Sequence, residues 1–478
     1  MQDAAYASLL RSRRQQLHAQ IAQALEEKYP DVSARRPEIL AHHFASAGLE
    51  EQAKHYWSRA GRLALANANY VEANNHLAKA VELAAKAPPS EARTREEAAL
   101  LVDRCVVLAP FTGPASTRQV AADAVRVSAV LGDDPLHFRA RWADWMFHSV
   151  GGDLPGGSER ADALVAMANR IGADDLKLQA HHARWTTGFL RGEVARARED
   201  IEQGLVLYHP ERHRDHWSMY GAHDPGVCAR ATGGCVIWQS GLTERANEVS
   251  KDAIRISNEL GHPFSRAIAQ FYAGFLAIMI RDIAAADACA QATAAIAAES
   301  NMLWPASLAR FIAGWVSAQR SEIGRGSDQM EVVFRHLQQI GQRAYLAFLG
   351  TQIATAKLAM GRIEDTLNFL EELQQLSVET HQLMFSSEFH RLRAEALRRL
   401  DPRSERIEAE YSTALQVARR QGTPALELRA TCGLAGRLAE IGQAQEGWKL
   451  LCPVFEQFQE GFATPDLRAA KALLNSLA

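Results

Sequence analysis

The chain is poor in cysteine and contains no closely spaced cysteine pair. Its 478 residues include six cysteines, which are scattered at Cys105, Cys228, Cys235, Cys289, Cys432 and Cys452. Scattered thiols in a chain of this length exclude a disulfide framework and are typical of a reduced cytosolic protein. The N-terminus also lacks a basic region followed by an apolar run, so no signal peptide is expected. The sequence therefore predicts a cytoplasmic protein.

The chain also lacks a surplus of basic residues and a long apolar run. It has 53 Lys and Arg against 56 Asp and Glu, and nucleic-acid binding needs a basic stripe that is absent here. The most apolar stretch runs from 267 to 280 and includes Gln270 and Tyr272. It is too short and too polar to span a bilayer, so we expect a buried helix there. Neither a nucleic acid nor a membrane is an expected partner.

Motifs that would carry catalysis are missing as well. The sequence has no Gly-x-x-x-x-Gly-Lys-Ser/Thr phosphate loop and no Gly-x-Ser-x-Gly nucleophile motif. Neither nucleotide hydrolysis nor serine-type hydrolysis is therefore expected from this chain alone. The sequence predicts a protein that is not an enzyme by itself and has no cofactor.

What the chain does have is a signature of glycine and small residues that returns about every 40 residues, a period typical of a helical solenoid. One copy consists of Gly241, Ala246, Ser250 and Ala253. The start points of successive copies are Gly241, Arg281, Ser321, Gly361, Pro402 and Gly442. Weaker copies precede them, one at Gly192. A stack of repeated units is expected to grow along one axis.

The partner helix of each repeat is visible at a fixed offset. Seven positions before five of the six start points stand small residues, namely Gly234, Gly274, Gly314, Ala354 and Ala435, whereas Glu395 breaks the rule. Small residues let two helices approach closely, as tetratricopeptide repeats require. We expect an all-α, tetratricopeptide-like superhelical solenoid of about ten helix pairs. The standard unit has about 34 residues, so helices or loops should be longer here.

The N-terminal part predicts further helices and a linker. Residues 7–28 have an apolar face at helical spacing that ends at Tyr29-Pro30. Residues 36–86 read as the first tetratricopeptide-like helices, with Gly48 closing one of them. Pro88-Pro89 marks a linker over 87–93, and residues 94–478 form the main solenoid. A polar, turn-rich loop near 208–226 interrupts it.

That loop is a candidate functional segment because long insertions on a solenoid carry function more often than the stack does. Its candidate residues are Trp217, Tyr220, His223 and Asp224. Four histidines of the loop, together with Asp215, Asp224, Cys228 and Cys235, have ligand types that suit zinc. Their spacing is irregular, with no CxxC or HExxH unit, so a polar loop that caps or docks on the array is favoured and no metal is expected. Asp224-Pro225-Gly226 predicts a tight corner that shapes the loop.

A concave groove is the second candidate, because the first helix of each pair lines it in tetratricopeptide arrays. The repeat offsets place seven residues near that face: His182, Trp238, Phe271, Phe275, Met279, Phe311 and Trp315. An aromatic groove could hold a protein segment, a peptide or a small-molecule effector. The alternative is that longer helices shift the register and that these residues belong to the core.

A family resemblance covers nearly the whole chain and keeps the same order from end to end. It is carried by the stretches QDAAYASLLRSRRQQLHAQIAQALEEKYP, PEILAHHFASAGLEEQAKHYWSRAGRLAL, HDPGVCARATGGCVIWQSGLTERANEVS, ELGHPFSRAIAQFYAGFLAIMIRD, FHRLRAEAL, ELRATCGLAGRL and EGFATPDLRAAKALL. The chain resembles the C-terminal tetratricopeptide-like region of bacterial proteins that join an adenylate/guanylate cyclase domain to a STAND-type predicted ATPase. The resemblance implies that residues 1–35 are the end of a winged-helix, ATPase-associated segment.

The cyclase and nucleotide-binding motifs of those proteins are absent from this sequence. The resemblance therefore implies the regulatory half of a signalling enzyme, present as a truncated product, a separately encoded partner or an engineered fragment. The leading hypothesis is an interaction and sensor module that regulates an ATPase switch and a cyclase or similar output. An alternative is a regulatory subunit or truncated piece of a cyclase enzyme, acting with a separate cyclase/ATPase chain. A transcription-activator effector domain is disfavoured, because no basic recognition helix follows the array.

Overall fold

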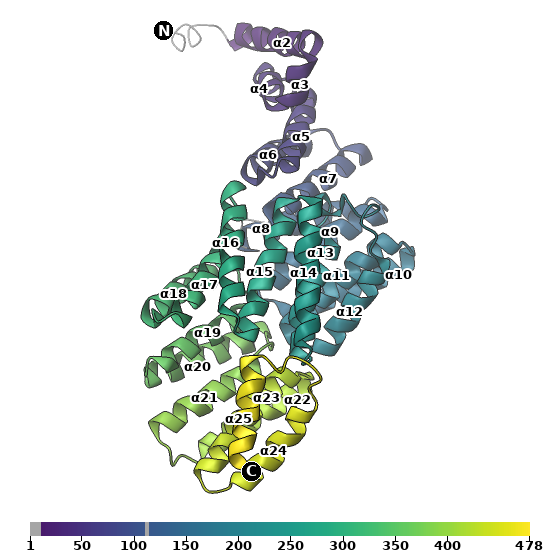
Figure 1. Cartoon of the computed structure of the whole chain (residues 1–478). Helices are drawn as coiled ribbons and strands as arrows, with labels where there is room; N and C mark the ends of the chain where they lie inside the picture. Colours follow the sequence, from purple (N-terminus) through teal and green to yellow (C-terminus); the bar gives the residue numbers. More distant parts are fainter. Residues whose placement is uncertain (1–10, 110–113) are drawn as a thin grey trace. The chain divides into compact units, whose positions relative to one another are not determined.

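The computed structural model describes residues 11–109 and 114–478, and within these residues the regular structure is helical with no strand. The part of the predicted 7–28 helix before Arg11 lies outside the described residues. The all-α fold class expected from the sequence is confirmed. In the described residues most consecutive helices pack against each other in pairs (Figure 1).

The chain divides into two compact units. Unit 1 comprises Met1–Phe111, Ser116–Asp144 and Ser218–Ala222, and unit 2 comprises Thr112–Ala115, Trp145–Trp217 and His223–Ala478. The helices that begin in the N-terminal part are α2 (Arg11–Lys28), α3 (Pro30–Arg35), α4 (Pro37–Ala47), α5 (Glu50–Ala66), α6 (Tyr70–Lys86), α7 (Glu91–Leu108), α8 (Pro114–Ser128) and α9 (Asp134–Val150). The boundary between the units falls inside α9. The domain limits expected near residues 35 and 94 stay predictions.

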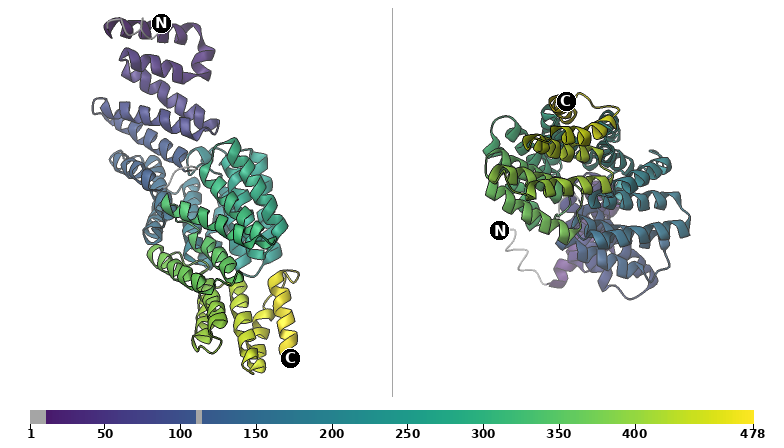
Figure 2. Two further views of the ribbon diagram at one scale, coloured as in Figure 1. Left: turned by 90° about the vertical axis from the view of Figure 1, so that its left-hand side faces the viewer. Right: turned by 90° about the horizontal axis from the view of Figure 1, so that it is seen from below.

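Unit 2 continues with helices of similar length, stacked in chain order (Figure 2). They are α10 (Leu154–Ile171), α11 (Asp174–Arg191), α12 (Val194–Leu207), the short 3-10 helix η1 (His216–Ser218), α13 (Pro225–Gln239), α14 (Thr243–Leu260), α15 (Pro263–Ile280), α16 (Ile283–Glu299), α17 (Leu303–Gln319), α18 (Ile323–Gln339), α19 (Leu346–Ala359), α20 (Ile363–Thr380), α21 (Ser386–Leu400), α22 (Arg406–Gln421), α23 (Pro424–Glu440), α24 (Ala444–Glu456) and α25 (Pro465–Leu477).

The N-terminal helices follow the sequence pattern closely. Pro37 occupies the first turn of α4, and Gly48 ends this helix in the left-handed conformation. Helices α5 and α6 pack together through small and apolar residues, with Ala73 and Leu77 fully buried. The predicted linker is shorter than expected, because Ser90 already caps α7 by accepting a hydrogen bond from the Arg93 amide.

The repeat start points of unit 2 are the turns between the two helices of each pair. Gly192, Gly241, Gly361 and Gly442 have φ values between 72° and 86°, the left-handed region that glycine enters without a side-chain clash. Arg281 and Ser321 adopt the same region at φ 62° and 82°. The predicted register of the array is therefore confirmed at these turns, including the two where another residue replaces glycine.

The close helix contacts predicted from small residues are visible in the α17–α18 pair. A Cβ atom added to Gly314 would come 3.1 Å from the Gly326 carbonyl oxygen. A Cβ added to Gly326 would come 2.4 Å from the Gly314 carbonyl oxygen and from the Ala318 nitrogen. Backbone lies against backbone at this point, so no larger residue fits without moving a helix.

Helix α15 contains the apolar stretch and is longer than the sequence suggests. It begins at Pro263, and by length and composition it is the described helix that could cross a membrane. However, 78% of its apolar window is buried inside the structure. Its side chains therefore fill the interior of the array, as expected from the sequence.

Successive coils of unit 2 contact each other through backbone hydrogen bonds. The Arg343 amide, in the turn after α18, donates to the Val150 carbonyl at the end of α9 over 3.0 Å. The Met384 amide, in the turn after α20, donates to the Leu190 carbonyl in α11 over 3.3 Å. The corresponding contact one repeat further on, at the end of α13, brings Gly241 against Pro424 at the start of α23. Unit 2 is thus a solenoid whose neighbouring coils touch.

Candidate functional site

Unit 2 contains a cavity of about 340 Å³. It is lined by residues of α15, α17, α19, α21 and α23, together with Arg281 at the end of α15. These are the first helices of five successive pairs, and two of them, α15 and α17, carry groove candidates from the sequence. The cavity lining includes Trp315, one of the seven groove candidates.

Six of the fourteen residues that line this cavity are charged. Arg281, Arg391, Arg399 and Arg429 line it together with two glutamates, Glu388 and Glu395. An adjacent cavity of about 260 Å³ shares Arg281, Arg391, Glu395 and Arg429. Arginine therefore outnumbers carboxylate on the cavity wall, and the surplus charge is positive.

Arg391 is held rigidly by carboxylates of its own helix. Its Nε and Nη2 atoms donate to the two Glu388 oxygens over 2.7 and 3.0 Å, and its Nη1 donates to Glu395 over 2.6 Å. Glu388, Arg391 and Glu395 are spaced three and four residues apart on α21, so they share one face. This bidentate arrangement fixes the guanidinium plane at the cavity wall.

Arg429 joins helices that are distant in sequence. Its Nε donates to Asp466 over 2.8 Å, and its Nη2 donates to the Met279 carbonyl over 2.6 Å. Its guanidinium carbon lies 5.1 Å from the centre of the Trp238 ring, within the range of a cation–π contact. Arg429 thus connects α23 to α13, α15 and α25.

The electrostatic balance of the cavity favours an added negative charge. The charge of Arg429 lowers the pKa of the Arg281 guanidinium, and burial acts in the same direction. Burial opposes the ionisation of Glu388, but the charges of Arg391 and Arg429 outweigh it and hold the pKa of Glu388 at about 2. Glu388 is therefore ionised at neutral pH. The mutual repulsion of the arginines would be relieved by an anionic ligand.

The groove candidates occupy different places from those expected. All seven are buried, and Trp315 is the one that lines the charged cavity. Phe271 and Phe275 pack with Tyr272 and Tyr345 in an aromatic cluster, and Phe311 is fully buried. These apolar side chains lie in the interfaces between neighbouring helices, where burial removes them from water. The open aromatic groove is corrected to a charged cavity with one tryptophan in its wall.

The charged cavity residues were missed by the sequence analysis. Glu388, Arg391 and Glu395 resemble ordinary charge pairs on an exposed helix face. A usable signal was present, because Glu395 stands where five other repeats carry a small residue. The break in the repeat pattern marks the helix that carries the buried charges.

The inserted loop is present, with irregular backbone from residue 208 to Asp224 around η1. Two of its candidates have clear partners within their own unit. Trp217 stacks on His262 with 4.2 Å between ring centres. Tyr220, in unit 1, is buried beside Phe138 and Trp142.

The corner predicted at Asp224-Pro225-Gly226 is wrong, because these residues begin helix α13. Asp224 is the N-cap and accepts a hydrogen bond from the Val227 amide over 2.8 Å, while Pro225 occupies the first turn. The Tyr208 hydroxyl also donates to Asp224 over 3.1 Å. Glycine is required at 226, since a Cβ there would lie 2.4 Å from the Tyr208 ring.

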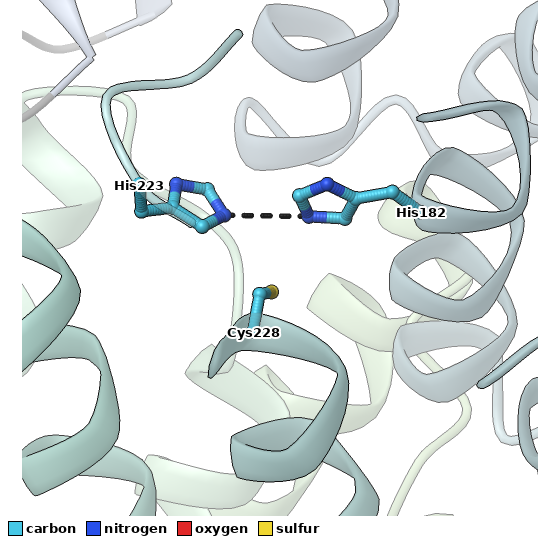
Figure 3. Close-up of side chains that lie close together, drawn as sticks. All are labelled: His182, His223 and Cys228. Carbon is cyan, nitrogen blue, oxygen red and sulfur yellow. Dashed lines mark hydrogen bonds between the residues drawn. The ribbon is translucent and has the colours of Figure 1, made fainter. Parts of the chain in front are cut away.

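The groove candidate His182 and the loop candidate His223 lie next to each other, together with Cys228. His182 of α11 and His223 of the loop face one another with 3.3 Å between their Nε2 atoms, and the Cys228 thiol of α13 lies beside them (Figure 3). The three potential ligand atoms all lie within 4.8 Å of one another. Burial, with the neighbouring His223, lowers the pKa of His182, and burial raises the pKa of the Cys228 thiol to about 12.

A second histidine cluster has a different arrangement. His213 donates from Nε2 to Asp175 over 2.9 Å, while its Nδ1 accepts from the His209 amide. The Nδ1 atom of His216 accepts from the Gln179 side-chain amide over 3.0 Å. Hydrogen bonds within the protein therefore account for both nitrogens of His213, so this cluster reads as a structural network.

Comparison with known proteins supports the fold and leaves the function open. No family model matches the chain. An uncharacterized protein of Rhizobium meliloti (strain 1021) is 24% identical over 436 residues, which cover 90% of this chain and 42% of that protein. The chain thus spans less than half the length of this curated relative.

Two solved structures are similar in fold. A Rap protein complexed with competence and sporulation factor has a TM-score of 0.52 and 10% identity over 80% of this chain and 99% of that one. Yeast Tom70 has a TM-score of 0.36 and 11% identity over 96% of each chain. From the first likeness and the repeat register we conclude that the chain has a tetratricopeptide-like helical-repeat fold.

Proposed function

We propose that this chain is a non-catalytic helical-repeat sensor module that binds an anionic group of a protein or peptide partner in the α15–α23 cavity. The observation that carries the proposal is the arginine surplus in unit 2, where Arg281, Arg391, Arg399 and Arg429 line one cavity. Guanidinium groups recognise carboxylate and phosphate through paired hydrogen bonds. The occupant argued for here is a peptide segment that ends in a carboxylate or carries acidic side chains.

The four arginines are not equally engaged by the protein itself. Arg391 and Arg429 already make several bonds to Glu388, Glu395 and Asp466 and thereby build the wall. Arg281 makes an ion pair with Asp466 at 3.3 Å and keeps about half of its side chain exposed. Arg399 donates to the Leu358 carbonyl, a neutral partner. Arg281 and Arg399 are therefore the residues that we assign to the ligand.

A solved structure of similar fold and the form of helical-repeat arrays both favour a peptide as the ligand of Arg281 and Arg399. The Rap protein of similar fold was solved in complex with competence and sporulation factor. Tetratricopeptide-like arrays offer an inner face built from successive helices, and a peptide can contact several of them at once. An extended segment laid along α15 to α23 would contact five repeats, with Trp315 available for an apolar side chain.

We further propose that ligand binding is passed to a signalling output. The resemblance to cyclase–ATPase fusion proteins supports a regulatory role for this region. A ligand that binds one curvature of the solenoid more tightly would shift the population toward it and bias an ATPase switch and a cyclase or similar output. Turnover of ATP or GTP by the purified chain alone would contradict this role.

The test is a binding screen with paired peptides. A library of acidic peptides with free C-terminal carboxylates would be compared with the same peptides amidated, by thermal shift and then by calorimetry. Because a ligand of the native state raises its apparent stability, free-acid peptides should raise the melting temperature more than amidated ones. Arg281→Gln combined with Arg399→Gln should weaken binding at least about tenfold, roughly the loss of one charge-assisted hydrogen bond.

The control is Arg310→Gln, which removes an exposed arginine of α17 outside the cavity lining. This variant should bind as the unaltered protein does. Equal affinity for free-acid and amidated peptides, or equal affinity in the double variant, would place the ligand elsewhere and overturn the proposal.

A further inference from the structure

His182, His223 and Cys228 converge on one point from three separate segments. His182 lies in the middle of α11, Cys228 in the first turn of α13, and His223 in the loop just before the Asp224 cap. In Figure 3 both imidazole rings direct a nitrogen toward the other, and the sulfur lies to one side of the line that joins them. We propose that these three residues form a Zn²⁺-binding site, independently of the cavity described above.

The spacing of the two imidazole nitrogens matches tetrahedral coordination. Zinc binds histidine nitrogen at about 2.0–2.1 Å, so two such ligands at a tetrahedral angle lie about 3.3–3.4 Å apart. The Nε2 atoms of His182 and His223 are 3.3 Å apart. The Cys228 sulfur lies within 4.8 Å of both, against about 3.6 Å in a tetrahedral zinc site, so the thiol would move toward the ion on binding. Two imidazoles and one thiolate are ligands that zinc prefers.

The surroundings orient the His182 ring for this role. Its Nδ1 lies 3.2 Å from Gln179 Oε1, and the Gln179 amide nitrogen donates to His216. Because the amide orientation of Gln179 is thereby set, Nδ1 of His182 is the protonated nitrogen and Nε2 presents its lone pair toward His223 and Cys228. A hydrogen bond from the second ring nitrogen to a neighbouring oxygen is the usual support of a zinc-bound histidine.

The surroundings of Cys228 contain a donor without an acceptor. Trp185 is fully buried, and its Nε1 has no hydrogen-bond partner among the described residues. The Trp185 indole and the Thr232 hydroxyl both lie beside the Cys228 sulfur, the hydroxyl oxygen at 3.9 Å. A metal-bound thiolate would supply the acceptor that the indole lacks, whereas a neutral thiol accepts hydrogen bonds weakly.

The second histidine cluster shows what a non-metal arrangement looks like in the same segment. In that cluster Asp175 and the His209 amide occupy both nitrogens of His213, and a guanidinium of Arg212 lies 2.8 Å from the same carboxylate. At the proposed site two imidazole nitrogens lie 3.3 Å apart with a thiol beside them. Without a metal, one of these nitrogens must donate a hydrogen bond to the other, and the experiment separates the two cases.

A zinc ion here would connect the inserted loop to the array. His223 would tie the end of the loop to α11 through His182 and to α13 through Cys228. Three protein ligands leave the fourth position of the ion for water or for an added ligand. The aromatic rings of Trp145, Trp185 and Phe264 around the histidines would limit access of solvent to it.

The experiment measures metal content and a metal–sulfur bond in the whole chain. The protein would be incubated with Zn²⁺, dialysed, and analysed by mass spectrometry for bound metal. Equimolar zinc is expected for the unaltered chain, and loss of most of it is expected for His223→Ala and for Cys228→Ser. Co²⁺ in place of Zn²⁺ should give a thiolate-to-cobalt charge-transfer band that disappears in Cys228→Ser.

Matched controls come from the same loop and from another buried thiol. His209→Ala and Cys289→Ser should retain equimolar zinc and the cobalt band, since neither belongs to the three-residue group. His223 is only partly buried, so His223→Ala is the variant expected to fold, and circular dichroism checks this. No zinc retained by the unaltered chain, or equal zinc in His223→Ala, or a cobalt band that survives in Cys228→Ser, would overturn the proposal and leave a hydrogen-bonded histidine pair.

Discussion

The hydroxyl groups of Tyr272 and Tyr345 share a hydrogen bond of 2.6 Å across 73 positions of sequence. Both side chains are buried, and Tyr345 adopts a left-handed backbone at φ 68° in the turn before α19. The bond therefore joins α15 to a turn two repeats later, inside an aromatic cluster. Each hydroxyl is the other's partner at this contact.

Removing both hydroxyls should cost less than the sum of the costs of removing each one alone. Tyr345→Phe or Tyr272→Phe leaves the other hydroxyl buried with a lost partner, and we expect each to lower the free energy of unfolding by about 1–3 kcal/mol. The double variant should lose clearly less than the sum of the two, because no buried donor then lacks its acceptor. Urea unfolding of the four proteins measures this cycle. Strictly additive losses would mean that the two hydroxyls do not interact.

The contact between α17 and α18 predicts a strong effect of a single methyl group. Gly326→Ala would place Cβ 2.4 Å from the backbone of α17, so we expect a loss of about 1–3 kcal/mol or more from overpacking. Gly436→Ala on α23 is the control, since nothing lies within 4 Å of its added Cβ. This control should be neutral or stabilise by up to about 1 kcal/mol, because alanine favours a helix. Thermal unfolding would show opposite shifts, and equal shifts would contradict the packing described.

Glu388 predicts a dependence of stability on pH. The pKa of Glu388 is about 2 in the folded protein, below its ordinary value of 4.5, so the folded state binds fewer protons than the unfolded state between these values. Its contribution is fully present above pH 4.5 and is lost as the pH falls toward 2, amounting to about 3 kcal/mol. Glu388→Gln should be less stable than the unaltered chain at pH 7, and the difference should shrink across this window. A difference that does not change with pH would refute the ionised, arginine-paired carboxylate.

The cap of α13 predicts a larger effect than an exposed cap elsewhere. Asp224→Ala removes the acceptor of the Val227 amide and of the buried Tyr208 hydroxyl. We expect a loss of about 2–3 kcal/mol, because a cap and a buried partner are lost together. Asp282 caps α16 through the exposed bond from the Ala285 amide alone, so Asp282→Ala should cost about 1 kcal/mol. Denaturant unfolding of metal-free protein compares them, and similar losses would show that the Tyr208 contact contributes little.

The repeat register could be predicted because its turns and close helix contacts require particular residue types at fixed positions in the sequence. A left-handed turn favours glycine, as at Gly241 and Gly361, and backbone contact requires small residues, as at Gly314. These marks recur at a fixed step, so helix pairs and their turns follow from the sequence alone. The cavity is lined by the first helices of five successive pairs.

The side chains of the candidate sites could not be predicted in the same way. Phe271 and Phe275 have helical spacing whether they face a groove or a neighbouring helix, because both positions are apolar. Arg391 and Glu388 look like a surface pair until the fold buries them. His182 and His223 stand 41 positions apart, and their meeting depends on how α11 and the loop are placed. Periodicity fixes which helices lie together, but not which polar groups lie opposite each other.

The hydrogen bonds from Arg343 to Val150 and from Met384 to Leu190 fix the pitch of the solenoid in unit 2. In an open helical array each repeat contacts only its neighbours, so the array can bend gradually by small rotations shared among all its repeats. An array whose coils are joined must first release these backbone groups, and each has to find a new partner in water. Unit 2 is therefore expected to uncoil in discrete steps rather than to stretch gradually.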